Sequence, residues 1–172
     1  MTIAANIVLY QLGWLACVLG AARGLPWVGV TAAAAIVAWH LARAARPGRE
    51  LALVALAALL GLAFETVLVR GGWVSYPHGA LLDGAAPLWM AALWALFATT
   101  LNVSLRPLRA RPWFGAVLGA AGAPLAYYAG ARLGALHLAA AGSALAVIGA
   151  GWALCTPALF AAARRLDGYP RP

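Results

Sequence analysis

The sequence predicts an all-helical bundle embedded in a membrane, and three observations carry this prediction. Of the 172 residues, 65% are hydrophobic and only 9% are charged, whereas about 25% of the residues of a soluble domain are charged. The mean hydropathy is +0.88. Six apolar runs of helical length follow one another, and the segments between them hold the arginines. We therefore expect one membrane domain, residues 1–172, with no separate soluble catalytic domain.

The first three apolar runs cover residues 4–22, 27–41 and 51–69. An apolar helix of about 20 residues, rising about 1.5 Å per residue, spans the hydrocarbon core of a bilayer. Gly24 and Pro26 predict a tight turn after the first run, because glycine frees the backbone and proline lacks the amide hydrogen that a continuing helix donates. Pro47 and Gly48 predict the next helix end for the same reason.

The last three runs cover residues 87–105, 113–131 and 136–163. A glycine-rich segment, residues 70–86, precedes the fourth run and is the only long polar connection. The fourth run is uncharged and ends in three arginines, Arg106, Arg109 and Arg111. Pro124 lies inside the fifth run, where its missing amide hydrogen favours a kink. The sixth run is long enough to tilt or to extend past the membrane.

The arginines are distributed unevenly over alternate connections, and this distribution predicts the orientation. Nine of the twelve lie in the connection after the second run, the connection after the fourth and the C-terminal tail. The opposite side holds Arg23, Arg70 and Arg132. Since cytoplasmic segments carry the excess of basic residues, we expect six transmembrane helices and both termini in the cytoplasm. A five-span chain is the alternative, but it would place the arginines of the tail outside.

The net charge of +8 raises the question of nucleic-acid binding. The basic residues stand in short clusters at the ends of apolar runs, which is the distribution of topology determinants and not of a basic binding face. We therefore expect no nucleic-acid partner. Membrane lipids are the expected surroundings.

Glu65 is the most unusual residue of the apolar runs. It shares a helix face with Ala58 and Gly61 and should point into the bundle. A carboxyl group is costly in lipid and is expected to be paired, protonated or exposed to a cavity. Glu65 is therefore the best candidate for a catalytic group. The structural alternative is an ion pair with an arginine of the same side, Arg23, Arg70 or Arg132, or a side chain that extends to the membrane interface.

Three amides also lie within the runs, at Asn6, Gln11 and Asn102. An amide in hydrocarbon needs a partner, and hydrogen bonds between helices are favoured over contacts with a polar substrate. Tyr127 follows Pro124, and a kink there would open a pocket beside Glu65. We expect a small cavity whose substrate-binding residues are Asn6, Gln11, Glu65, Asn102 and Tyr127.

No metal or cofactor motif is found in the chain, and neither is expected. His78, Asp83 and His137 lie on one predicted side of the membrane, but their spacing is unlike that of a zinc site such as HExxH. Cys17 and Cys155 lie inside apolar runs and form no CxxC pair, so both are expected to be packing residues. Most tryptophans lie toward the ends of runs, as in the aromatic belts of membrane proteins.

Small residues form a stripe along the fifth run, including Gly115, Gly119 and Gly122. Such stripes let helices approach closely in lipid. This face is a candidate surface for an oligomer or for a membrane-protein partner.

Several segments together resemble a known family. They are Asn6 and Gln11 with the following Gly13 and Trp14, the turn VLGAARGLPW, and above all PLWMAALWALFATTLNVSLRPL in the fourth run. They are similar to the small bacterial inner-membrane proteins grouped as domain of unknown function 2878. The resemblance covers nearly the whole chain and implies an integral inner-membrane protein with no assigned activity. It also implies polar positions at Asn6, Gln11, Asn102 and Tyr127 and an acidic residue on the third run, here Glu65.

Three functions are compatible with these observations. The preferred one is binding or modifying a lipid or other apolar small molecule that enters the cavity sideways from the bilayer. A small transporter or channel-like protein that uses Glu65 as a proton or cation site is the alternative. An assembly subunit of a membrane complex is the third. No nucleophile elbow, P-loop or dinucleotide fingerprint occurs, so no particular enzymatic reaction is predicted.

Overall fold

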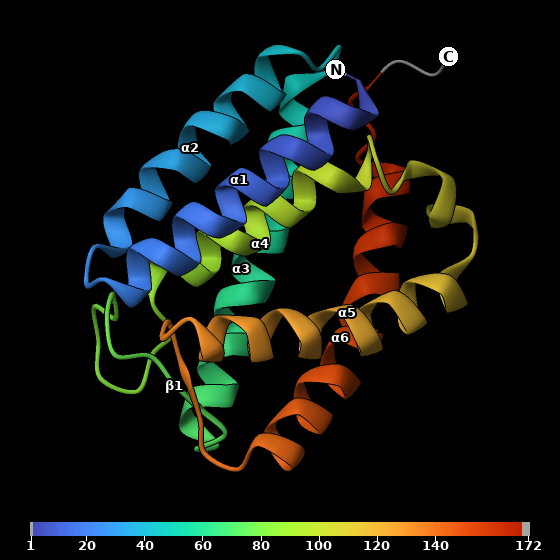
Figure 1. Ribbon diagram of the computed structural model, residues 1–172. Helices are drawn as coiled ribbons and strands as arrows, with labels where there is room; N and C mark the ends of the chain where they lie inside the picture. Colours follow the sequence, from blue (N-terminus) through green and yellow to red (C-terminus); the bar gives the residue numbers. More distant parts are fainter. Residues whose placement is uncertain (1, 170–172) are drawn as a thin grey trace.

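The computed structural model describes residues 2–169, and this part of the chain is built mainly of six α-helices (Figure 1). The helices are α1 (Ile3–Ala22), α2 (Pro26–Ala42), α3 (Pro47–Arg70), α4 (Leu88–Leu101), α5 (Pro112–Arg132) and α6 (Ala141–Arg165). A 3₁₀ helix, η1 (Arg106–Ala110), joins α4 to α5. Two short strands, β1 (Val74–Ser75) and β2 (His137–Leu138), pair antiparallel. The all-helical class predicted from the sequence is confirmed.

The central helix of the bundle is α4. It contacts α1 and α2 on one side, packs along α3 on another and also touches α6. Trp89, Trp94 and Leu96 of this helix are almost completely buried. α1 and α2 lie side by side, whereas α5 packs chiefly along α6 (Figure 1). The α5 and α6 pair therefore joins the rest of the bundle mainly through α6.

Glycine permits the closest contacts between helices. Gly29 of α2 faces the backbone of Cys17 in α1, and Gly61 of α3 faces the indole ring of Trp94. A methyl group at either glycine would overlap these atoms. Cys17 is fully buried at the first contact, in agreement with a packing role. Small residues thus set the distances between helices, as expected where lipid gives no hydrophobic drive for association.

Three of the described helices, α1, α3 and α6, are long and apolar enough to cross a membrane. α2 and α4 are apolar but shorter, with 17 and 14 residues. At about 1.5 Å per residue, α4 is roughly 21 Å long and shorter than a hydrocarbon core. Large apolar side chains are strongly exposed on the outside of the bundle, among them Leu59, Leu125 and Leu154. Such an outer surface is typical of contact with lipid or with another apolar partner.

The fourth predicted span, residues 87–105, is wrong at its C-terminal end because α4 ends at Leu101. The hydroxyl groups of Thr99 and Thr100 donate to carbonyl oxygens three residues earlier, at 2.7 and 2.6 Å. The backbone N–H of Leu105 then turns back to the carbonyl oxygen of Thr100 at 2.9 Å. These local hydrogen bonds compete with the helical pattern and redirect the chain into η1.

The sixth predicted span, residues 136–163, is wrong at its N-terminal end because α6 begins at Ala141. The preceding residues form β2, in which Leu138 lies opposite Val74 of β1. The N–H of Ala139 continues the pairing with the carbonyl oxygen of Trp73. Pairing with a distant segment, which an apolar run does not reveal, therefore decides the start of this helix.

The remaining helices agree with the predicted spans to within one residue at each end, except that α3 starts earlier than residue 51. Pro47 occupies the first turn of α3, where its fixed φ and missing N–H are tolerated. This earlier start places Glu50 in the first turn of the helix and not in a solvated connection.

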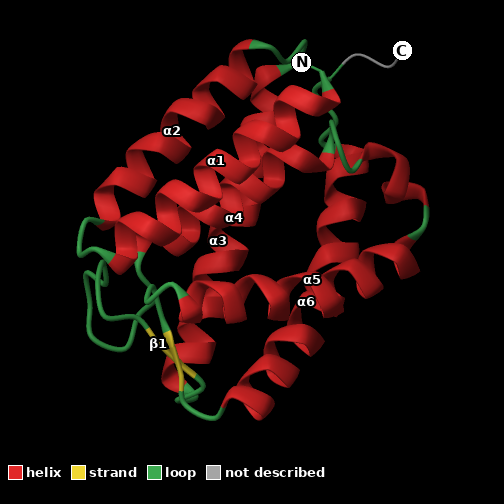
Figure 2. Cartoon of the chain, viewed as in Figure 1, coloured by secondary structure: helices red, strands yellow, loops and turns green. Residues whose placement is uncertain are grey.

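Most of the arginines gather at one end of the bundle, which we call the arginine-rich end. It consists of residues 43–50, 102–111 and 164–169, held together by contacts such as Arg46 N–H to the carbonyl oxygen of Gly168 at 2.9 Å. The opposite end holds the α1 to α2 turn, the loop from α3 to α4 and the two strands (Figure 2). Arg171 is one of the nine arginines that the sequence places on the cytoplasmic side, but it lies outside the described residues.

Candidate functional site

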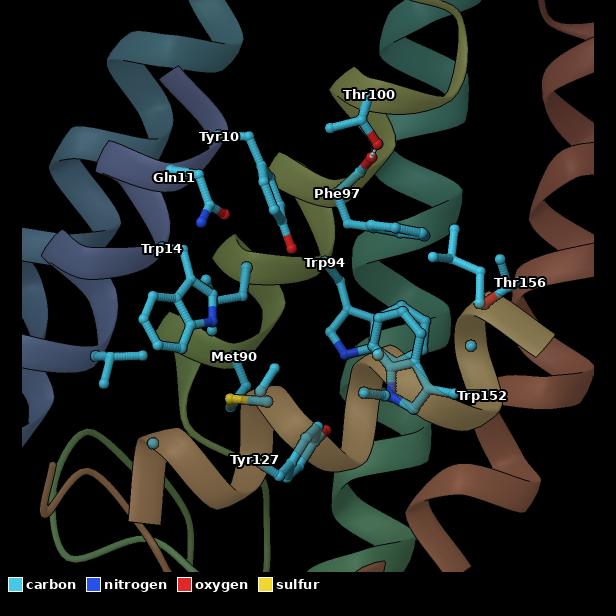
Figure 3. Close-up of a pocket in the computed structure, with 18 of the residues that line it drawn as sticks. Tyr10, Gln11, Trp14, Met90, Trp94, Phe97, Thr100, Tyr127, Trp152 and Thr156 are labelled. Atoms are coloured by element: carbon cyan, nitrogen blue, oxygen red, sulfur yellow. Dashed lines mark hydrogen bonds between the residues drawn. The ribbon is translucent and has the colours of Figure 1, made fainter. Parts of the chain in front are cut away.

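A cavity of about 360 Å³ lies between α1 and α4 on one side and α5 and α6 on the other (Figure 3). Its lining is mostly apolar, and no charged residue of the described chain is part of it. Aromatic side chains form much of the wall: Tyr10, Trp14, Trp89, Trp94, Phe97, Tyr127 and Trp152. A concave, mainly apolar pocket with a few polar groups is the usual form of a small-molecule site.

The cavity opens sideways, between α1 and α5. Ile7 and Gln11 of α1 and Leu118 and Gly122 of α5 line it, and all four are exposed, so the cavity is not closed between these two helices. A Cβ atom added at Gly122 would meet nothing within 4 Å. Because α5 packs chiefly along α6 and not along α1, the space between the two helices stays open.

Glu65 lies directly behind the wall of the cavity. Its side chain is fully buried and accepts hydrogen bonds from Trp94 Nε1 at 3.0 Å, from the Tyr76 hydroxyl at 2.6 Å and from the Tyr127 hydroxyl. Trp94 and Tyr127 are wall residues, so the carboxyl group is hydrogen-bonded to the cavity wall without being part of the lining. Within the described chain its partners are these three neutral groups, and the predicted alternative of an arginine partner is wrong.

Tyr76 reaches Glu65 from the loop after β1. Burial, and next the charge of Glu65, raise the pKa of Tyr76 well above its ordinary value. The phenol therefore stays protonated near neutral pH and remains a hydrogen-bond donor. Its ring also packs edge-on against Trp89, with ring centroids 5.5 Å apart, which fixes the loop over this end of the cavity.

The five predicted site residues do not share one cavity. Gln11 and Tyr127 line it, and Glu65 backs it through Tyr127. Asn6 and Asn102 lie outside it. The Gln11 amide makes no hydrogen bond to a described residue, so at the mouth of the cavity it is free for other contacts. The expectation of a single cavity lined by all five residues is therefore corrected.

Asn6 connects α1 to the end of α4. Its Nδ2 donates to the carbonyl oxygen of Thr99 at 3.2 Å, and its Oδ1 accepts from the backbone N–H of Ser104 at 3.3 Å. Asn6 is 2% exposed, so both halves of its amide are satisfied inside the bundle. Asn6 therefore makes hydrogen bonds between segments of the bundle, which is the role that the sequence favoured over contact with a substrate.

Asn102 belongs to a second polar cluster, centred on Glu50 at the arginine-rich end. Glu50 is fully buried and accepts from Asn102 Nδ2 at 2.6 Å and from the Gly168 N–H at 2.7 Å. His40 Nε2 lies 2.9 Å from the other carboxylate oxygen. Asn102 Oδ1 in turn accepts from Arg109. The cluster joins α2, α3 and α4 to the tail.

Asp167 and Tyr169 fasten the tail to this cluster. Asp167 pairs with Arg106 at 2.7 Å and with Arg109 at 3.0 Å. Burial alone would raise the pKa of Asp167, but hydrogen bonds from Arg109 and the Tyr169 amide, with the charges of both arginines, lower it overall. The Tyr169 hydroxyl donates to the carbonyl oxygen of His40 at 2.7 Å, and burial and the charge of Glu50 raise its pKa to about 12.

Sequence reasoning missed His40 and Glu50. Glu50 lies on the same face of α3 as Glu65, because the buried positions Glu50, Val54, Ala57, Gly61 and Glu65 follow at steps of three and four. This spacing is the signal that would have found it. Grouping Glu50 with the neighbouring arginines as part of a connection hid it.

The aromatic wall was also missed. Trp27, Trp39 and Trp113 are exposed, in agreement with a belt at the ends of the helices. Trp14 and Trp89, expected in the same belt, line the cavity instead. Periodicity does not distinguish an aromatic ring that faces lipid from one that faces a cavity, since both surfaces are apolar.

The glycine stripe of α5 is used mainly within the chain. A Cβ atom at Gly115 would lie 2.9 Å from the ring of Phe160, and one at Gly119 would overlap the backbone carbonyl of Trp152. These two glycines therefore bring α5 against α6, while Gly122 lines the cavity. Docking of an oligomer or membrane-protein partner on this face stays a prediction.

Comparison with known proteins gives a family for this chain. The family model described as "Protein of unknown function (DUF2878)" matches residues 3–158, which include all of α1 to α5 and most of α6. Neither curated proteins nor solved structures gave a match. The match agrees with the resemblance carried by the fourth run and the first turn. The chain therefore belongs to the DUF2878 family.

Proposed function

We propose that this protein crosses a bacterial inner membrane six times and binds or modifies a lipid or other apolar small molecule in the cavity between α1 and α5. The single observation that carries the proposal is the position of the mouth. It opens between two helices whose outer surfaces expose large apolar side chains, including Val8 and Leu12 of α1 and Val117 and Leu125 of α5. In a bilayer such a mouth faces lipid, so an apolar molecule would enter without passing through water.

The proposed orientation places the arginine-rich end, and with it both termini, in the cytoplasm. It is supported by the gathering of the basic segments at that end and by the positive-inside rule. The short α4 is accommodated because it is surrounded by other helices of the bundle and needs no lipid contact along its whole length. The cavity would then lie near the middle of the bilayer, at the depth of Gln11 in α1.

A phenylalanine at Gly122 tests the proposal, because this position has room for a side chain that would fill the mouth. Gly142 is the matched control: it is also helical and exposed with nothing within 4 Å of an added Cβ, but it lies outside the cavity. We expect native mass spectrometry to find a co-purified apolar molecule on the wild type and on Gly142→Phe, and to find it lost from Gly122→Phe. Equal occupancy of all three proteins, or none on the wild type, would contradict the proposal.

A second candidate function is proton-coupled transport through Glu65. It is favoured by one arrangement: the carboxyl group bridges Tyr76 in the loop and Tyr127 in the cavity wall, so a hydrogen-bonded chain connects the loop to the cavity. Proteoliposomes would then show a pH-dependent flux that Glu65→Gln abolishes. A flux that persists in this variant would remove Glu65 from the transport path.

A further inference from the structure

Three acidic side chains pack inside the described structure. Glu50 has His40 as its basic partner, and Asp167 has Arg106 and Arg109. Glu65, which is fully buried, is held only by the neutral donors of Tyr76, Trp94 and Tyr127. Buried carboxylates are normally paired with a positive charge, because an unpaired charge is poorly solvated in an apolar interior. Glu65 therefore differs from the other two acids in having no basic side chain among its partners in the described chain.

The three donors fit an ionised carboxylate. Trp94 Nε1 is able only to donate, and it shares one carboxylate oxygen with the Tyr127 hydroxyl, while the Tyr76 hydroxyl takes the other oxygen. Hydrogen bonds of this kind favour the charged form, whereas burial disfavours it, so a cation in front of the carboxyl group would supply the counter-charge that the described chain lacks. They also point the negative charge toward the wall of the cavity, because Trp94 and Tyr127 are wall residues.

The wall itself is suited to a positive charge. Rings from α1, α4, α5 and α6 surround the cavity, and indole and phenol faces attract cations within about 6 Å of the ring centre. Trp94 is 1% exposed, with Gly61 and Trp152 packed against its ring, so its ring face is not free. Trp14, Phe97 and Trp152 are partly exposed and offer ring surface to the cavity. No arginine or histidine of the described chain lines the cavity, so no fixed cation competes for the site.

On the basis of the proposed function, we infer that the molecule bound in the cavity is a cationic amphiphile. Its quaternary or protonated amine would lie beside Tyr127 and the partly exposed ring of Trp152, on the cavity side of the wall that Glu65 backs. Its apolar chain would leave through the mouth between α1 and α5, past Ile7 and Leu118. The exposed Gln11 amide, which has no partner in the described chain, would meet a polar group next to the amine.

An inorganic cation fits the site less well. Hard cations are bound by several oxygen ligands, whereas the polar groups near this cavity are few and the lining is dominated by rings and aliphatic side chains. Among the described residues no group of three or more His, Cys, Asp or Glu side chains is placed to hold a metal. An alkylammonium group needs no such ligand set, because its charge is spread over carbon-bound hydrogens that contact aromatic faces.

The test compares two probes of the same shape in nanodiscs of zwitterionic lipid: octyltrimethylammonium and its uncharged isostere 2,2-dimethyldecane. The full chain is titrated with each probe, and binding is followed by the indole N–H resonances of Trp94 and Trp152. Half-saturation of the wild type is expected at a mole fraction of the cation roughly tenfold lower than that of the isostere. Glu65→Gln should remove this preference and leave the binding of the isostere unchanged.

Asp83→Asn is the matched control, because it removes the same charge from the exposed loop without touching the cavity. It should keep the preference for the cation. Preference retained in Glu65→Gln, or equal binding of both probes to the wild type, would overturn the inference and leave the proposed function standing. Failure of both probes to bind the wild type would overturn both.

If Glu65→Gln does not fold, the preference of the wild type for the cation over the uncharged isostere still tests the inference, because this comparison needs no variant. Phe97→Leu adds a second measurement that leaves Glu65 in place, since Phe97 lines the cavity without contacting the carboxyl group. It should weaken binding of the cation about threefold and leave the isostere unaffected. Equal weakening of both probes by Phe97→Leu would show that the ring contributes only apolar contact and would count against the inference.

Discussion

Glu50 and Glu65 lie about four helical turns apart on one face of α3, and their surroundings give them different roles. Glu50 binds the amide of Asn102, the backbone of Gly168 and the ring of His40, and so fastens three helices and the tail. Glu65 binds two residues of the cavity wall. The same residue type on the same helix thus serves assembly at one end and the candidate binding site at the other.

Asn102→Ala tests the first role. The substitution leaves a buried carboxylate and a buried guanidinium each without one hydrogen bond, and hydrogen bonds to charged groups contribute about 1.5 to 3 kcal/mol each. We expect the free energy of unfolding in mixed detergent micelles to fall by roughly 2 to 4 kcal/mol. Ser143→Ala, an exposed control at the start of α6, should change it by less than about 0.5 kcal/mol. Equal effects of the two substitutions would refute the assembly role.

The tail should detach in acid. Asp167 has a folded-state pKa below its ordinary value of 3.8, so its pairing with Arg106 and Arg109 stabilises the docked tail fully above that value. This stabilisation is lost as the pH falls below 3.8 and through the folded-state pKa. Hydrogen exchange at the Gly168 amide, measured from pH 7 downward, should show protection decreasing below about pH 4. Asp167→Asn should lower the protection already at pH 7; protection that decreased on raising the pH would contradict this account.

At the scale of whole elements, the positions of the helices could be predicted and several of their ends could not. The six apolar runs correspond to α1 to α6 because each helix is apolar along its length, both on the side that packs in the bundle and on the side that is exposed. The end of α4 depends instead on local hydrogen bonds of Thr99, Thr100 and Leu105, with the Asn6 amide bound to Ser104 just beyond it. The start of α6 depends on the pairing of Val74 with Leu138, a contact between distant segments. These contacts cannot be predicted from the composition of the apolar runs.

Two glycines of α5, Gly119 and Gly122, should respond differently to substitution by alanine. Gly119→Ala places a methyl group against the carbonyl of Trp152, so it should force the helices apart and lower the free energy of unfolding by about 1 to 3 kcal/mol. Gly122→Ala, one turn away and facing open space, should be neutral or slightly stabilising, because alanine favours a helix more than glycine does. Chemical denaturation of both variants in detergent checks the difference. Similar values for the two would show that the close approach at Gly119 is unimportant.

On the scale of the whole molecule, the candidate site arises where the α5 and α6 pair faces α1 and α4. Glu65, Gln11 and Tyr127 could be predicted from the sequence, because polar groups in an apolar run require an explanation. The cavity itself could not, since its wall is made of Trp14, Trp94 and other apolar rings that also suit lipid or a packed core. The structure identifies these rings as part of a candidate site because rings from four helices line the same cavity.

We expect the mouth of this cavity to open to the bilayer, and a spin label at Gly122 reports whether the mouth is in contact with lipid or with water. The label is attached to a cysteine introduced at Gly122, in a chain whose Cys17 and Cys155 are replaced by alanine and which is reconstituted in lipid. Power saturation should show high accessibility to oxygen, which concentrates in the hydrocarbon, and low accessibility to a water-soluble nickel chelate. A label at Asp83, in the exposed loop, should show the reverse. High accessibility of the Gly122 label to the nickel chelate would place the mouth in water and contradict the account.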